Sequence, residues 1–158
     1  MEKIMTLPSR QDINVYDSLD ERCACEHFLG KSLDEAEALF RESWLFYQED
    51  LMFMGIGAFR FYVQAAIRYI QSESVTGDSS IVSCFAMILE FRLEHESAEL
   101  VPIADQLASI CGYILERHER FDFTPETLDD DPVRVQTLQQ TLFGLQTRFK
   151  LLSLERAA

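Results

Sequence analysis

The segment from Cys23 to His27, with the sequence CACEH, places two thiols and an imidazole close together. Thiolates and imidazoles are the usual ligands of zinc. On a helix, residues four apart share a face, so Cys23 and His27 converge whereas Cys25 points away. A structural zinc site needs four ligands, and the remaining cysteines and histidines of the chain show no paired spacing. We therefore predict no metal site, and we interpret the segment as small thiols beside a surface histidine.

His95 is the second candidate for chemistry, because Glu94 and Glu96 flank it and neighbouring carboxylates favour the imidazolium. A solvated helix end gives the same pattern. A two-iron site requires a glutamate three residues before each histidine, and none of the three histidines has one. The chain also lacks G-x-S-x-G, H-E-x-x-H and a glycine-rich phosphate loop. We predict no catalytic residue and no cofactor, which favours a non-enzymatic protein while leaving an enzymatic activity open.

Arg60 and Arg68 are the candidates for binding an anionic ligand. On a helical wheel, the segment 58–72 has a broad apolar surface and a narrow polar seam that contains both arginines. We predict that Arg60 pairs with Glu94, because burying an arginine without a carboxylate is costly. The alternative is a small-ligand-binding or catalytic helical domain with a pocket lined by aromatic side chains, in which Arg60 and Arg68 hold an anionic ligand.

A repeated tetrapeptide, Ser-Leu-Asp-Glu at 18–21 and 32–35, marks the beginning of two helices. In each copy the serine and the glutamate form a capping box, and Gly30 ends the first helix. Apolar residues at spacings of three and four predict the other helices, and no segment alternates as a half-buried strand does. The expected helices are 19–29, 33–54, 58–72, 81–96, 102–120 and a last one that begins at Pro132 after an acidic loop and the cap Asp131.

These elements predict an all-α fold with one domain. The expected architecture is a compact bundle of five or six helices over 17–158, preceded at 1–16 by a loose arm or a short docking segment. The helices at 58–72 and 81–96 have the widest apolar surfaces, so we place them at the centre of the bundle. A chain of 158 residues is long enough to bury a core of this kind without disulfides.

The acidic charge of the chain is the main indication of a partner. The sequence has 27 Asp and Glu against 14 Lys and Arg, a formal net charge of −13. Such a chain repels nucleic acids and anionic membrane surfaces. Glu35, Glu42 and Glu49 share the outer side of the expected 33–54 helix. We therefore predict an interaction module, such as a regulator, inhibitor or immunity-type protein, that presents these glutamates to a basic protein.

Two further expectations concern the environment of the chain. The four cysteines form no C-x-x-C pair, and the first residues lack the apolar core of a signal peptide, which favours reduced thiols and a cytoplasmic location. The 12 phenylalanines, five tyrosines and one tryptophan are a large aromatic load for a helical protein, and they predict a bulky, well-filled core. Part of this aromatic load could form an exposed patch that makes a homodimer.

The sequence AFRFYVQAAIRYI at 58–70 resembles a segment of small uncharacterised bacterial helical proteins. In those proteins a segment of the type AFRYYLPA follows a leader rich in Asp and Leu. Here EDLMFMGIG at 49–57 stands in the leader position, and Gln64 replaces the proline. The resemblance implies a bacterial helical domain of unknown role, and no functional residue carries over from it.

Overall fold

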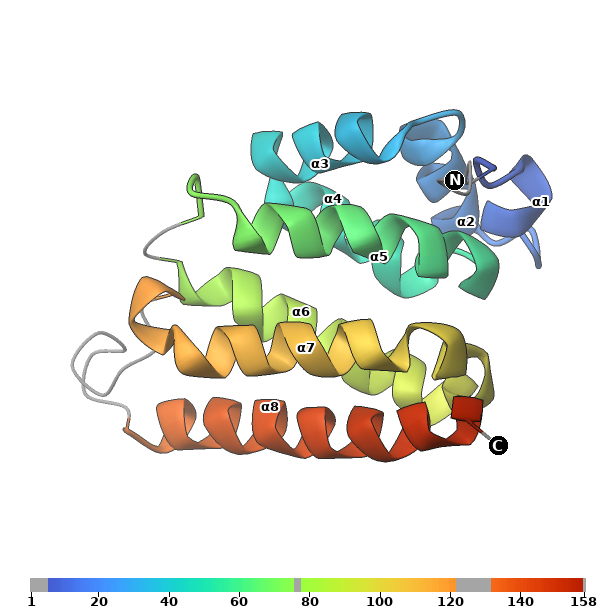
Figure 1. Ribbon diagram of the computed structural model, residues 1–158. Helices are drawn as coiled ribbons and strands as arrows, with labels where there is room; N and C mark the ends of the chain where they lie inside the picture. The colour runs from blue at the N-terminus through green and yellow to red at the C-terminus, as the bar shows by residue number, and fades with distance from the viewer. Residues whose placement is uncertain (1–5, 76–77, 122–131, 158) are drawn as a thin grey trace, which may run out of the picture. The chain divides into compact units, whose positions relative to one another are not determined.

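The computed structural model of the chain describes residues 6–75, 78–121 and 132–157 (Figure 1). Every regular element within these ranges is a helix, so the all-α prediction is confirmed. The chain divides into two compact units, residues 1–70 and 71–158, which we describe separately. The single domain expected over 17–158 stays a prediction.

The first unit contains four helices of ten residues or fewer and one longer helix of 16 residues. They are α1 (Arg10–Ile13), α2 (Leu19–Phe28), α3 (Leu33–Glu42), α4 (Trp44–Phe53) and α5 (Ile56–Gln71). The expected 58–72 helix is α5, and ten of its residues are buried. The tyrosine in the middle of α5 fastens this helix to the end of α2: the Tyr62 hydroxyl donates to the carbonyl oxygens of Phe28, at 2.7 Å, and Lys31, at 3.0 Å.

The capping boxes form as the sequence predicts. The Ser18 and Ser32 hydroxyls accept from the backbone N–H groups of Glu21 and Glu35. In return, the carboxylate of each glutamate accepts from the backbone N–H of its serine. Gly30 follows α2 with a φ of 80°, the left-handed turn that a glycine permits.

The sequence predicts a loose arm at 1–16, whereas residues 10–13 form α1 and Ile13 is completely buried. A capping box built from Ser9 and Asp12 begins this helix. Gly55 fits α1 closely, since its N–H donates to the Ile13 carbonyl at 2.8 Å and a Cβ there would overlap the Asp12 carbonyl oxygen. The sequence pattern misses α1 because one turn of helix has no periodicity.

Glu21 fastens the loop between α1 and α2. Its carboxylate accepts from the backbone N–H groups of Val15 (2.8 Å), Tyr16 (3.0 Å) and Ser18 (3.0 Å), and from the Ser18 hydroxyl (2.6 Å). Burial opposes ionisation of this carboxyl, but the four hydrogen bonds outweigh it and lower the pKa of Glu21. The loop is therefore held by an ionised side chain that is almost completely buried.

The single helix expected at 33–54 is wrong. Ser43 has extended backbone angles, φ −157° and ψ 90°, and separates α3 from α4. The sequence contains no glycine or proline to mark this break. On the far side of it, the buried Trp44 ring lies 5.5 Å from Phe40 and stacks at 5.8 Å on Tyr69 of α5. The change of direction lets Trp44 fill the space between α3 and α5, and it places Glu49 on a different helix from Glu35 and Glu42.

The second unit combines long α-helices with short 3-10 helices. These are α6 (Ser79–Glu96), η1 (Ser97–Ile103), α7 (Ala104–Glu116), η2 (His118–Phe121), α8 (Pro132–Ser153) and η3 (Leu154–Ala157). The expected 81–96 helix is α6, whereas the 102–120 helix is α7 with a 3-10 helix at each end. The acidic segment 124–131, including the expected cap Asp131, lies outside the described residues.

Close packing of α7 and α8 organises the second unit. A Cβ at Gly112 of α7 would lie 2.6 Å from the Gln146 side-chain nitrogen of α8, so the glycine permits this approach. Arg120 of η2 donates to the Tyr113 hydroxyl at 2.7 Å, to the Val75 carbonyl at 3.2 Å and to the Ser72 carbonyl. The arginine therefore fixes the segment before α6 against the end of α7.

One stretch of the described chain, 79–116, is long and apolar enough to cross a membrane by length and composition alone. The stretch is not one continuous α-helix, because η1, with Pro102 inside it, separates α6 from α7. Arg92, near the end of α6, is buried and bonds to Glu96 at 2.6 Å.

Candidate functional site

A hydrogen-bonded histidine and aspartate connect α2 to α4. His27 Nδ1 lies 2.7 Å from Asp50 Oδ2. Asp50 is only 6% exposed, whereas the His27 ring is half-buried. Burial raises the pKa of Asp50, and the hydrogen bond with His27 opposes that rise only in part. The carboxylate fixes the orientation of the ring and leaves Nε2 as its second hydrogen-bonding atom.

Aromatic rings of α4 surround the imidazole. The His27 ring centroid lies 5.1 Å from that of Phe46 and 5.3 Å from that of Tyr47, the latter edge-on. Tyr47 in turn meets Phe28 at 6.2 Å, also edge-on. The His27 ring is therefore held on one edge by a carboxylate and on its sides by rings, an arrangement that leaves it little freedom to move.

An exposed apolar surface lies on α4 beside this pair. Leu45, Phe46, Glu49 and Phe53 are all exposed and follow one another at helical spacing, and we call these four residues the α4 face. Phe46 is 58% exposed although its ring contacts His27. Exposed aromatic residues with charged neighbours are typical of protein-binding surfaces.

The three glutamates predicted to face a partner are exposed, but they do not share one helix. Glu35 belongs to the α3 capping box, and hydrogen bonds from Ser32 lower its pKa. Glu42 is the last residue of α3, and Glu49 lies within the α4 face. Glu42 and Glu49 therefore lie on either side of the break at Ser43, whereas Glu35 lies at the far end of α3.

The two predicted ligand-binding arginines differ in their surroundings. Arg68 Nη1 lies 3.3 Å from Asp34 Oδ1, and both side chains line a hollow of about 350 Å³ with Leu7, Ser32, Leu33 and Phe61. Arg60 is half-buried and is not among the residues that line this hollow. The predicted pair between Arg60 and Glu94 would join the two units and stays a prediction.

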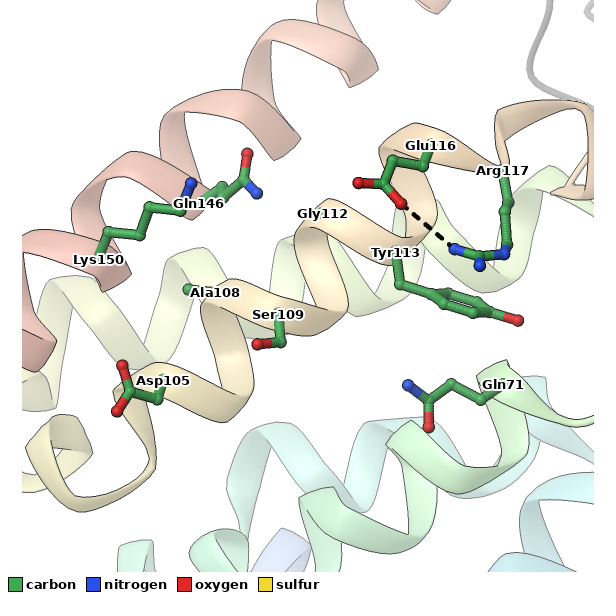
Figure 2. Close-up of a pocket in the computed structure, with 10 residues that line it drawn as sticks. All are labelled: Gln71, Asp105, Ala108, Ser109, Gly112, Tyr113, Glu116, Arg117, Gln146 and Lys150. Atoms are coloured by element: carbon green, nitrogen blue, oxygen red, sulfur yellow. Dashed lines mark hydrogen bonds and ion pairs between the residues drawn. The ribbon is translucent and has the colours of Figure 1, made fainter.

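A cleft of about 420 Å³ opens along α7 and α8 in the second unit (Figure 2). Its charged side chains have both signs: Asp105 and Glu116 come from α7, and Lys150 from α8. Arg117 already has two partners. Its Nη1 lies 3.5 Å from Glu116 Oε2, and its Cζ lies 4.3 Å from the centroid of the Tyr113 ring. None of the residues predicted to bind a ligand lines this cleft.

Neither Asp50 nor Phe46 could be assigned a role from the sequence. Asp50 lies 23 residues from His27, and its approach to α2 depends on the unmarked break at Ser43. Phe46 belongs to a run of apolar residues in which nothing distinguishes an exposed ring from a buried one. The only available signal is that Phe46 lies off the stripe formed by Trp44, Tyr47 and Leu51.

Within the described ranges, no three His, Cys, Asp or Glu side chains gather as a metal ion would require. The resemblance of the segment 58–70 to bacterial helical proteins stays a prediction, and so does the cytoplasmic location. Comparison of the chain with protein-family models, with curated proteins and with solved structures found no match.

Proposed function

We propose that this chain is a non-enzymatic interaction module whose α4 face binds a basic protein partner. The observation that carries the proposal is the Phe46 ring, which is 58% exposed and packed against His27, while His27 is itself bonded to the buried Asp50. An aromatic ring that is both accessible and fixed is the usual centre of a protein interface.

Fixing the ring before binding increases affinity. Association costs side-chain entropy, and a ring already held in place loses less of it. Burying an exposed phenylalanine contributes about 1.5–3 kcal/mol. Leu45 and Phe53 on the same side of α4 extend the apolar area around Phe46.

The charge around the α4 face sets the class of partner. Glu49 lies within the face, Glu42 precedes α4, and Glu26 is exposed next to His27 in the sequence. The chain as a whole carries a net charge of −13. An acidic surface of this kind accelerates association with a basic partner, and salt weakens that attraction. The preferred partner therefore combines Lys or Arg side chains with an apolar group that covers Phe46.

The test uses a fluorescent amphipathic helical peptide made of Leu and Lys, with a scrambled peptide of the same composition as the reference. Anisotropy titrations at low and high salt compare the wild type with Phe46→Ser and Glu49→Gln. Phe143→Ser is the matched control, because Phe143 is an exposed phenylalanine of α8.

We expect Phe46→Ser to weaken binding of the amphipathic peptide at least about tenfold, the loss typical of a central interface residue. Glu49→Gln should reduce the salt dependence, and Phe143→Ser should bind as the wild type does. Equal binding of the scrambled peptide would contradict the proposal, as would no binding at low salt.

A second candidate function is the binding of a small anionic ligand beside Arg68, without Arg60, which does not line the same hollow. The observation in its favour is the hollow that Arg68 and Phe61 line. Against it, Asp34 already lies 3.3 Å from Arg68 and would repel an anion. Calorimetric titration with inorganic phosphate tests this function: heat that disappears in Arg68→Gln supports it, and the absence of heat in the wild type removes it.

A further inference from the structure

The helix α8 has two apolar sides, and the unit covers only one of them. The stripe at helical spacing in the sequence consists of Val135, Leu138, Leu142, Leu145, Phe149 and Leu152; the inner side of α8 buries the first five, whereas Leu152 is half-buried. On its outer side, Val133, Phe143 and Leu151 are exposed, as is Leu154 in η3, which continues the chain. Phe143 is 64% exposed. A monomer gains nothing from a second apolar side on its last helix.

The outer residues follow the spacing of a coiled-coil seam. Positions separated by alternating steps of four and three residues are occupied by Val133, Thr137, Gln140, Gly144, Thr147, Leu151 and Leu154, and we call these residues the α8 seam. The Thr137 and Thr147 hydroxyls donate to the carbonyl oxygens of Val133 (2.8 Å) and Phe143 (3.0 Å), so both hydroxyls are satisfied within the helix. The seam can therefore face another apolar surface without leaving these hydroxyls unpaired.

Gly144 lies in the middle of the seam, and nothing within its own unit requires a glycine there. A Cβ at Gly144 would meet no atom within 4 Å, whereas a Cβ at Gly112 would meet Gln146 at 2.6 Å. A glycine inside a helix costs about 1 kcal/mol relative to alanine. A glycine on an exposed helix face does permit the close approach of another backbone.

A groove of about 300 Å³ runs beside Gly144. It is lined by Gln140, Thr141, Gly144 and Arg148 of α8 and by Glu90 of α6. Glu90 and Arg148 therefore flank the same side of the seam and have opposite charges. Phe143 precedes Gly144 by one residue, which places it on the other side of the seam.

We propose that two copies of this chain form a symmetric dimer by packing their α8 seams antiparallel about a two-fold axis at Gly144. The seam complements itself in that arrangement: Thr137 and Leu151 lie seven residues on either side of Gly144, so each meets the other across the axis. Val133 and Leu154 lie eleven and ten residues from Gly144, so they come level to within one residue at the ends of the seam. Gly144 meets Gly144 of the second copy, which lets the two helices approach closely.

Charge complementarity selects a second copy as the occupant. Arg148 lies four residues after Gly144, so antiparallel packing brings Arg148 of the second copy level with Gln140, in the groove that contains Glu90. The two-fold axis places equivalent flanking residues of the two copies on the same side of the interface. Glu90 of each copy therefore faces Arg148 of the other, which gives two equivalent ion pairs. On the other side, Phe143 packs against Phe143 of the second copy. Such a surface is isologous, as in most homodimers.

The salt dependence of this dimer is opposite to that of the α4 face. Each copy carries a net charge of −13, so the two copies repel one another at long range. Exposed ion pairs contribute only about 0.2–1 kcal/mol each. Added salt screens the repulsion more than it weakens the two ion pairs, and the apolar contacts do not depend on screening. Dimerisation should therefore strengthen as the salt concentration rises.

Sedimentation equilibrium of the full chain tests the proposal. The wild type should reach twice the chain mass of 18.3 kDa as concentration and salt increase. Phe143→Glu should abolish the dimer, and the matched change Phe46→Glu on α4 should leave it intact. Gly144→Gln should weaken the dimer at least tenfold while the unfolding free energy of the monomer rises or stays constant, a combination that a purely structural role of Gly144 does not give.

The ion pairs supply the test of register. Glu90→Arg and Arg148→Glu should each weaken the dimer, and the double variant should restore it. A wild type that stays at 18.3 kDa at every concentration would overturn the proposal. A dimer that Phe143→Glu leaves intact, or that Phe46→Glu abolishes, would overturn it as well. Failure of the double variant to restore the dimer would overturn the antiparallel register.

Discussion

The α4 face and the α8 seam both expose apolar side chains, but different forces hold them in place. The α4 face lies on a ten-residue helix that is connected to α2 by a polar contact, the bond between His27 and Asp50. The α8 seam lies on a regular helix of 22 residues, continued by η3, whose buried inner residues are Val135, Leu138, Leu142, Leu145 and Phe149. Substitutions of buried polar groups should therefore damage the first surface and spare the second.

This difference extends to the two units. In the first unit, side chains stabilise the packing by bonding to backbone groups: Glu21 bonds to the loop after α1, and Tyr62 bonds to the end of α2. Gly55 acts differently, because the absence of a side chain lets α1 approach the beginning of α5. Helices α1 to α4 have ten residues or fewer, which is too short to be stable without such contacts. In the second unit, long helices provide most of the contacts. Arg120 adds polar contacts, because it donates hydrogen bonds to the segment before α6 and to Tyr113 of α7.

The largest effect should come from Gly55→Ala. A methyl group there overlaps the Asp12 carbonyl oxygen and crowds Val15, so α1 must move. We expect a loss of about 3 kcal/mol in the free energy of unfolding, the upper range for overpacking. Urea unfolding measures it, and Gly144→Ala is the control. That change should instead stabilise the chain by about 0.5–1 kcal/mol, because alanine favours the helix and meets no neighbour. Equal effects of the two substitutions would contradict this account.

Glu21→Gln should rank second. The variant loses the ionised acceptor of four hydrogen bonds, each of the stronger, charge-assisted kind. We expect a loss of about 2 kcal/mol at neutral pH. Because folding lowers the pKa of Glu21, its contribution is complete above the pKa of the unfolded chain and is lost as the pH falls through the folded pKa.

Urea unfolding over the acidic pH range separates the contribution of Glu21 from that of the other carboxylates. The wild type should lose stability more steeply than Glu21→Gln as the pH falls. Glu35→Gln, at the exposed copy of the same capping box, should have a smaller effect than Glu21→Gln. A variant whose stability changes with pH just as the wild type does would show that folding does not lower the pKa of Glu21.

Tyr62→Phe should cost about 1–1.5 kcal/mol, because the Phe28 and Lys31 carbonyl oxygens lose a common donor. Burial raises the pKa of Tyr62 to about 12, which keeps the hydroxyl protonated and able to donate at neutral pH. Thermal unfolding measures the loss. Tyr16→Phe, which changes an exposed side chain, should leave the transition unchanged, and a similar loss in that control would show that the Tyr62 bonds are not the cause.

Asp50→Asn should have the smallest effect on stability. Burial raises the pKa of Asp50, so its ionisation lowers stability as the pH rises from the unfolded pKa through the folded pKa. The amide oxygen of asparagine can still accept from His27. We expect neutral-pH stability within about 0.5 kcal/mol of the wild type. Chemical denaturation at two pH values checks this expectation, and a loss of several kcal/mol would mean that the ion pair outweighs burial.

The sequence predicts the elements whose signals are local. Both Ser-Leu-Asp-Glu boxes, the glycine turn at Gly30, and the helices α2, α5 and α6 follow from caps and periodicity. The inner side of α8 is predicted for the same reason, since a stripe at helical spacing has to be buried.

The features that the sequence does not predict depend on contacts between distant residues. The break at Ser43 turns the chain so that the Trp44 ring can stack on a tyrosine of another helix. Asp50 becomes a partner of His27 only after that break. The outer side of α8 is equally hard to interpret from the sequence, because Gln140 and Gly144 interrupt the apolar residues in the middle of the seam. The sequence also does not show which of the two sides of α8 packs against the rest of the unit and which stays exposed.

We propose that the α4 face in particular, and not exposed apolar surface in general, binds a basic partner. The most direct measurement is the affinity of the Leu and Lys helical peptide for Phe46→Ser and Phe143→Ser, compared at low salt. Our account predicts a loss of at least about tenfold for Phe46→Ser and none for Phe143→Ser. Equal losses in the two variants, or no loss in either, would contradict it.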